Sequence, residues 1–256
     1  MELIDSHAHL TFKGLAENID QVLERSIAAG VTGWVTVGTG LNENIRTVEL
    51  AEKFDNMYAA IGVHPHDAKD FNKKCGDQLR KLGSRKKVVA IGETGLDFHY
   101  DLSERQIQKD VFKTHLEIAQ QLNLPVIVHS REAFDETVKL LAEFKNSLKI
   151  VIHCFSGDTD QAKKYLEMGC FISFTGVVTF KNAEKIQTAA SIVPLDRMMV
   201  ETDCPYMSPE PVRKIRTCEP AMMTHTAKKL AQIKGISLDK FAEAVTKTTR
   251  GFFNLP

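Results

Sequence analysis

Two histidines, His7 and His9, stand two residues apart behind the short apolar run Leu3-Ile4 near the beginning of the chain. Side chains at positions i and i+2 of an extended strand point to the same side. Two imidazoles on one side of a strand can bind a single metal ion. Taken alone, the stretch also fits a turn with two exposed histidines, so the interpretation depends on whether the rest of the chain supplies further ligands.

Further side chains that bind metals recur at the ends of later apolar runs. In chain order they are Glu93, His129, His153 and Asp203. His64 and His66 occupy the end of another such run, so six of the nine histidines lie at these positions. A single histidine there is usually a hydrogen-bonded polar residue, but the recurrence favours one shared metal site.

The apolar runs themselves indicate the kind of sheet. Most of them are continuously apolar, which is typical of strands buried on both faces of a parallel sheet. Segments with the helical spacing of apolar residues lie between them. The eight runs cover residues 3–4, 33–39, 57–64, 87–93, 124–130, 148–154, 170–176 and 196–203.

Eight strands, each followed by a helix or helix-like segment, predict an α/β fold, a TIM (β/α)8 barrel with an extra C-terminal helix. We expect the barrel to form a single domain over residues 1–256, with the extra helix, at about 238–252, packed outside it. A doubly wound open sheet is the alternative. The first strand is not followed by a glycine-rich phosphate-binding loop, which argues against that alternative.

A barrel would bring the candidate ligands together, because the carboxyl ends of its strands all emerge on one face. A catalytic zinc ion takes three protein ligands and a water, so four imidazoles and two carboxylates suit two divalent ions, typically about 3.5–4 Å apart. We expect Glu93 to bridge them. The remaining ligands are then His7, His9 and Asp203 for one ion, and His129 and His153 for the other.

Composition limits the partners and the cellular setting. Lys+Arg and Asp+Glu are equal at 33 each, so nucleic-acid binding would need a local basic surface. The five cysteines include no CxxC pair, which argues against a disulfide framework and a zinc ribbon. Cys154 and Cys204 each follow a candidate ligand and should point away from the metals. With no signal peptide or membrane-spanning run, we expect a cytoplasmic monomer without an obligate protein partner.

Six motifs occur in an order that resembles the TatD family of metal-dependent hydrolases in the amidohydrolase superfamily. They are IDSHAHL, IGVHPH, IGETGLDFH, PVIVHSREA, HCFSG and ETDCPY, and the resemblance runs from residue 2 to about 253. It implies a TIM barrel and divalent-metal-dependent deoxyribonuclease activity, which in several members is a 3′→5′ exonuclease. It also implies the metal ligands, which fall on His7, His9, Glu93, His129, His153 and Asp203.

The chain departs from the family pattern in two places. Cys218-Glu219-Pro220 replaces the usual Asn-Glu-Pro, and Thr248 stands roughly where the final helix tends to carry an asparagine. Neither position is an expected metal ligand. The departures therefore bear on loop packing or substrate preference rather than on the metal site.

The predicted reaction is hydrolysis of phosphodiester bonds in DNA. Two divalent ions would acidify a water molecule and polarise a phosphoryl oxygen, and Asp203 is expected to accept the proton of the attacking water. We expect His64 either to contact a phosphate or leaving oxygen, or to orient other groups; His66 is a weaker candidate. Glu201 either supports a ligand or is purely structural. The ligand set admits zinc, magnesium, manganese, cobalt or nickel.

Basic residues in the loops after the strands are the expected contacts to a DNA substrate that is single-stranded or has frayed ends. They are Arg131, Lys181, Arg213, Lys214 and Arg216. For the last three, a solvated charged loop is the alternative. Phe98 and Phe180 are candidates for stacking on bases, with membership of the core as the alternative.

Two other functions fit the same ligand set. The first is hydrolysis of an ester or amide, as in a TatD-like D-aminoacyl-tRNA deacylase, because activated water attacks carbonyl carbon as well as phosphorus. The basic loop favours a phosphate-rich substrate over a small amide. The second is a metal-binding protein without catalysis, against which the intact ligand set argues.

Overall fold

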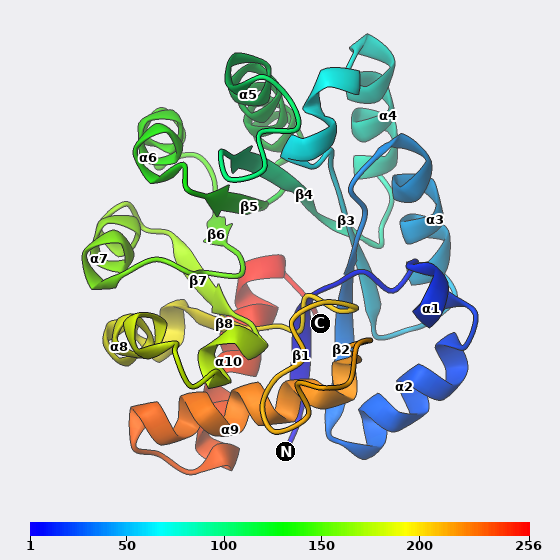
Figure 1. Cartoon of the computed structure of the whole chain (residues 1–256). Coiled ribbons are helices and arrows are strands. Elements are labelled where there is room, and N and C mark those ends of the chain that lie inside the picture. The colour runs from blue at the N-terminus through cyan, green and yellow to red at the C-terminus, as the bar shows by residue number, and fades with distance from the viewer.

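The computed structural model describes all residues from 1 to 256, and its centre is a barrel of eight parallel strands (Figure 1). The chain order of the strands is also their order in the sheet. The strands are β1 (Leu3–Ala8), β2 (Val31–Val37), β3 (Met57–Ile61), β4 (Val88–Asp97), β5 (Val126–Arg131), β6 (Ile150–Ile152), β7 (Phe171–Phe174) and β8 (Met198–Val200).

Backbone hydrogen bonds bring the first and last strands together. The N–H of Asp203 donates to the carbonyl of His7 at 2.9 Å, and the N–H of His9 donates to the carbonyl of Cys204 at 2.8 Å. These bonds join the end of β1 to the segment that follows β8. The (β/α)8 barrel predicted from the sequence is confirmed, and the open sheet is excluded.

Helices surround the barrel (Figure 1). They are α1 (Lys13–Ala16), α2 (Ile19–Ala28), α3 (Leu41–Ala51), α4 (Lys73–Gly83), α5 (Arg105–Leu122), α6 (Phe134–Ala142), α7 (Thr159–Glu167), α8 (Glu184–Ile192), α9 (Met223–Lys234) and α10 (Leu238–Phe253), with short 3-10 turns at Pro65–Asp70, Gly176–Thr179, Leu195–Arg197 and Pro220–Met222.

Local sequence explains where several helices begin and end. The carboxylate of Asp158 accepts hydrogen bonds from two backbone N–H groups of the first turn of α7, while the side chain of Gln161 bonds back to the backbone of Asp158. Asn123 and Gly235 adopt the left-handed backbone conformation that ends α5 and α9. None of the helices is both long and apolar enough to cross a membrane.

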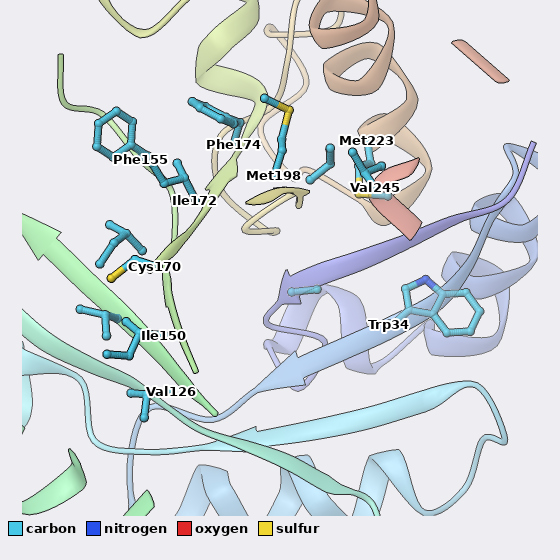
Figure 2. Packing of buried hydrophobic residues seen from close by; sticks show 14 of the residues in the cluster. Trp34, Val126, Ile150, Phe155, Cys170, Ile172, Phe174, Met198, Met223 and Val245 are labelled. Atoms are coloured by element: carbon cyan, nitrogen blue, oxygen red, sulfur yellow. The ribbon is translucent and has the colours of Figure 1, made fainter. Parts of the chain in front are cut away.

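Hydrophobic side chains fill two regions. The larger lies between the strands and the surrounding helices and includes Trp34, Val126 and Ile150 (Figure 2). The smaller consists of residues such as Val35 and Met199 on the inward side of the strands. Because alternate strand residues point to opposite faces, continuously apolar runs supply both regions at once.

The last turn of α10 lies differently from the prediction. The helix contacts β1 and β8 from outside, but Phe252 and Phe253 are buried within the smaller, inner cluster. The ring centroid of Phe252 lies 4.9 Å from that of Phe171. These two rings shield the inner apolar side chains from water, while the rest of α10 packs outside the barrel as predicted.

Candidate metal centre

Glu93 lies between two groups of imidazoles at the carboxyl end of the barrel. Its Oε1 is 2.7 Å from Nε2 of His153 and 2.9 Å from Nδ1 of His129. Its Oε2 lies 3.4 Å from Nε2 of His7 and 3.7 Å from Nε2 of His9. One carboxylate therefore presents an oxygen to each pair of histidines, which is the arrangement a bridging ligand needs.

Asp203 joins the group formed by His7 and His9. Its Oδ1 lies 3.3 Å from Nε2 of His9 and 3.7 Å from Nε2 of His7. Asp203 is three residues beyond the end of β8, not within the strand as predicted, and its φ of 56° is rare for a residue with a side chain. The bond from its N–H to the His7 carbonyl holds this conformation and directs the carboxylate to the cluster.

The two pairs of histidines that face Glu93 are not isolated from the neighbouring histidine or from each other. Nε2 of His64 lies 3.4 Å from Oε1 of Glu93, and the ligand atoms of His64, Glu93 and His129 are all within 4.8 Å of one another. His153 stacks on His7 with ring centroids 4.1 Å apart, and it also groups with His7 and Asp203. His64 thus lies as close to the central carboxylate as His7, and His153 is near both halves.

The spacing of the ring nitrogens fits bound metal ions. Nε2 of His7 lies 3.3 Å from Nε2 of His9, and Nδ1 of His129 lies 3.3 Å from Nε2 of His153. Two nitrogens that share a tetrahedral ion at about 2.0–2.1 Å are about 3.4 Å apart. Both pairs therefore have the separation of ligands to a common ion, and the mixed imidazole and carboxylate set suits divalent metals.

Asp97, which the sequence interpretation missed, lies directly behind this cluster. Its Oδ2 is 3.2 Å from Nε2 of His129 and 3.0 Å from Nε2 of His66, and its Oδ1 accepts the backbone N–H groups of His99 and Tyr100. The spacing in the sequence could have identified Asp97 as a candidate, because it follows Glu93 by four residues and residues i and i+4 share a face of a strand. β4 was predicted to end at Glu93, whereas it continues to Asp97.

Two further buried carboxylates, Glu201 and Asp5, hold the segments that carry the clustered side chains. Glu201 accepts hydrogen bonds from the backbone N–H of Cys154 at 2.6 Å and the hydroxyl of Ser173 at 2.7 Å, and its Oε1 lies 3.5 Å from Nδ1 of His153. Of the two roles expected for Glu201, support of a ligand fits these contacts.

The other buried carboxylate, Asp5, was not anticipated from the sequence. It accepts bonds from the N–H and hydroxyl of Thr202 at 2.9 and 2.6 Å, and from the N–H of His7. These bonds tie the strand of His7 to the segment that leads to Asp203. Burial raises the pKa of Asp5 to about 7, against the lowering effect of the Thr202 hydrogen bonds.

The electrostatics of the cluster follow from burial and close packing. Burial alone would raise the pKa of Glu93, but the charges of His153 and His64 hold it well below its usual range. Burial would also lower the pKa of His9, yet the hydrogen bond and charge of Asp203 raise it to about 9. Burial lowers the pKa of His7 and His64. It would also lower that of His153, but the charge of Glu93 raises it. The free site therefore carries protons on His9 and His153 rather than on every imidazole, and metal binding must release those protons.

His115, on α5, was not among the candidate residues but positions one of them. Its Nε2 accepts the backbone N–H of Val63 at 3.0 Å, and its Nδ1 lies 2.8 Å from the carbonyl of Val111. Burial lowers the pKa of His115 to about 4. A neutral imidazole therefore anchors the segment that leads into His64.

The candidate substrate contacts lie at the end of β5, in the case of Arg131, and in loops after later strands, and two of the candidate arginines cover aromatic rings. The guanidinium of Arg213 lies 3.8 Å from the ring centroid of Phe180, and that of Arg131 lies 4.7 Å from that of Tyr100. The ring of Phe98 is covered in the same way by Arg105, which lies at 4.5 Å. Phe98 and Phe180 are half-buried, so the structure leaves them less open to bases than expected.

The remaining basic candidates have no acidic partner. Lys181, Lys214 and Arg216 are exposed and make no ion pair, whereas Arg213 approaches Glu210 at 4.0 Å. A polar pocket of about 480 Å³ lies beside Arg131, next to the end of β5. These cations are free to meet an anionic ligand.

The two departures from the family pattern lie away from the cluster. Cys218 is buried, its N–H donates to the carbonyl of Pro205, and the neighbouring Glu219 forms a two-pronged ion pair with Arg25 of α2 at 2.8 and 2.9 Å. The hydroxyl of Thr248 donates to the carbonyl of Leu195. Cys218 therefore helps to pack the segment that follows Asp203, and Thr248 helps to pack α10 against the turn before β8.

The two cysteines beside candidate ligands do not join the cluster. Sγ of Cys154 lies 3.5 Å from the hydroxyl of Thr175, and Cys204 is fully buried. Burial raises the pKa of both thiols well above the usual range, which keeps them protonated and poor metal ligands.

Comparisons with known proteins agree with this geometry. Residues 4–254 match the family model described as TatD related DNase. The chain is 37% identical to the uncharacterized metal-dependent hydrolase YabD of Bacillus subtilis, over 99% of both chains. It is 34% identical to a 3′-5′ ssDNA/RNA exonuclease TatD of Pantoea ananatis, over 99% of this chain and 100% of that one. The crystal structure of YJJV, a TatD homologue from Escherichia coli, superimposes with a TM-score of 0.94 at 29% identity, covering 99% and 98% of the two chains.

Proposed function

Because this chain belongs to the TatD family of metal-dependent hydrolases, we propose that it hydrolyses the phosphodiester bonds of DNA, starting from a single-stranded or frayed 3′ end. The observation that carries the proposal is the position of Glu93, whose two oxygens each face a different pair of histidines. A pair of divalent ions bound there would acidify water and stabilise charge on a phosphoryl oxygen.

The protein side chains have distinct parts in the proposed reaction. Glu93 holds the two halves of the site together, with His7, His9, His129 and His153 as the imidazole ligands. Asp203 holds one carboxylate oxygen toward His9 and accepts the proton of the attacking water with the other. His64, which is less exposed than His66 and faces Glu93, contacts the phosphate or the leaving oxygen.

The choice of DNA rests on charge and on a relative. Arg131 at the end of β5, and Lys214 and Arg216 in the loop after β8, supply cations at the face of the metal centre, as a phosphate backbone requires. The Pantoea ananatis relative is named as an exonuclease of single-stranded DNA and RNA. The metal identity, the cytoplasmic location and the monomeric state stay predictions.

The test is to strip the purified protein of metal and incubate it with end-labelled single-stranded DNA while each of zinc, magnesium, manganese, cobalt and nickel is restored in turn. We expect shortening from the 3′ end that requires metal and that falls by at least about 100-fold in Asp203→Asn. The control is Asp196→Asn, which removes a carboxylate from the opposite end of β8.

Two results would reject the proposal. No cleavage with any metal, together with turnover of a D-aminoacyl-tRNA or a simple ester, would assign ester hydrolysis instead. Stoichiometric metal binding without turnover of any of these substrates would leave a metal-binding protein that does not catalyse.

A further inference from the structure

Exposed aromatic rings occur on one face of the molecule only. They are Phe12 after β1, Tyr100 after β4 and Tyr206 after β8, with 42%, 53% and 53% of their surface exposed. Every other phenylalanine and tyrosine, and the single tryptophan, is buried or half-buried. Single exposed rings are common on protein surfaces, but exposed apolar side chains that gather in one place often mark a binding site, and these rings gather at the face of the metal centre.

Phe12 and Tyr206 form a pair beside the metal centre. Their ring centroids are 6.2 Å apart with planes inclined at 67°, and the Tyr206 centroid lies 6.3 Å from that of His9, with planes at 70°. All these contacts are edge to face. Phe12 and Tyr206 nevertheless stay 42% and 53% exposed, so each keeps aromatic surface open to a ligand, next to a candidate metal ligand.

Backbone hydrogen bonds fix both rings relative to the cluster. The N–H of Phe12 donates to the carbonyl of His9 at 3.1 Å, and the N–H of Tyr206 donates to the carbonyl of Asp203 at 3.0 Å. Each ring thus stands three residues after a candidate ligand, in a closed turn. The segment after β8, gold in Figure 1, lies beside β1 and is held there by the bond from His9 to Cys204.

We propose that Phe12 and Tyr206 form a stacking platform for one unpaired nucleobase of the DNA strand, next to the phosphodiester bond at the metal centre. This inference rests on the proposed function. Every nucleobase has a flat face that can stack on an aromatic ring, so such a contact tolerates any sequence. A base within a duplex already has both faces covered by its neighbours. The platform therefore explains a preference for single-stranded ends without any hydrogen bond to a base edge.

The other rings on this face are less suited to the same role. The guanidinium of Arg131 covers Tyr100, and that of Arg213 covers Phe180. No guanidinium group covers Phe12 or Tyr206, and Met207, which follows Tyr206 in the chain, is also exposed. Phe12 and Tyr206 would then contact the base, because they form an uncharged and open surface. The cations farther along the loops would contact the phosphates.

The test compares two single-stranded oligodeoxynucleotides that differ only in an abasic residue placed beside the bond that is cleaved. Dissociation constants are measured for the wild type, for Tyr206→Ala and for Ile27→Ala, a control on the exposed face of α2. We expect Tyr206→Ala to weaken binding of the intact strand by roughly 5- to 100-fold, the usual range for one stacked base. It should leave binding of the abasic strand nearly unchanged.

A second measurement does not depend on catalysis. Tyr206→Trp preserves a ring and places an indole at the platform, while the native Trp34 is buried. We expect the intact strand to quench the emission of the new indole and the abasic strand to leave it unchanged. Retention of tight binding by Tyr206→Trp would show that loss in Tyr206→Ala is due to the ring rather than to misfolding.

Several outcomes would overturn the platform. Equal weakening of intact and abasic strands by Tyr206→Ala, or no weakening of either, would remove the base contact. A dimer that forms at high protein concentration and is lost in Tyr206→Ala would assign the rings to a second copy of the chain. If the indole is quenched but no metal supports cleavage, the platform stands and the proposed nuclease activity fails.

Discussion

Nε2 of His129 lies 3.2 Å from Oδ2 of Asp97, while Nδ1 of the same ring faces Glu93 at 2.9 Å. The carboxylate of Asp97 therefore fixes the orientation of the imidazole and leaves Nδ1 as its free ligand atom. Such outer partners raise the basicity of a metal-binding histidine and hold its ring in place.

Asp97→Asn should weaken metal binding by about 10- to 100-fold, the range observed for loss of such outer partners. The amide has the size of the carboxylate but cannot accept from both imidazoles on one charged oxygen. The measurement is a competitive zinc titration against a chelating dye. Asp101→Asn, in the loop that follows β4 and paired with Arg105 at the surface, is the matched control. Unchanged affinity in Asp97→Asn would show that His129 needs no such support.

Glu93→Gln should lower the metal content from two ions per chain to one or none and reduce DNA cleavage by more than about 100-fold, because loss of a ligand exceeds the loss of an outer partner. The amide nitrogen cannot replace the oxygen that faces one pair of histidines. Elemental analysis after dialysis gives the stoichiometry, and circular dichroism controls for folding. A variant that keeps two ions would refute the bridging role of Glu93.

His115→Gln should change the dependence of stability on pH. Burial lowers the pKa of His115 from 6.5 to about 4, so between these values the unfolded chain binds a proton that the folded chain does not. The contribution of His115 to the free energy of unfolding is complete above about pH 6.5. It falls as the pH drops toward 4, by up to about 3 kcal/mol. Urea unfolding of the wild type and of His115→Gln at pH 7 and 4.5 measures this free energy.

The glutamine variant retains an acceptor for the N–H of Val63 but does not titrate. The difference in unfolding free energy between wild type and His115→Gln should therefore shrink at the lower pH. A difference that stays constant between pH 7 and 4.5 would contradict the low pKa of His115.

Neutralising Lys214 and Arg216 together should weaken single-stranded DNA binding and flatten its dependence on salt. Each phosphate contact contributes about 0.7 to the slope of log K against log salt, so the slope should fall by about 1.4. Lys53 and Lys86, neutralised as a pair, are the control, because they lie near the amino ends of β3 and β4, away from the metal centre. An unchanged slope would show that the loop does not bind phosphates.

The sequence by itself determined the fold class and brought out the ligand candidates. Continuously apolar runs alternating with helical segments require a parallel sheet covered on both faces, and side chains such as His129 and Asp203 stand near the carboxyl ends of those runs. Parallel strands place these ends on one face whatever the details of packing. For this reason periodicity and spacing were sufficient for both inferences.

Only the tertiary structure decided which groups contact the candidate ligands and which rings stay exposed at the face of the metal centre. The contact of Asp97 with His129 spans 32 positions of the chain and that of Glu201 with Cys154 spans 47, and no local pattern encodes such pairs. Phe98, Phe180, Phe12 and Tyr206 look alike in sequence, but guanidinium groups cover the first two and leave the second pair open. Exposure depends on what packs against a side chain, and that is fixed only when distant segments meet.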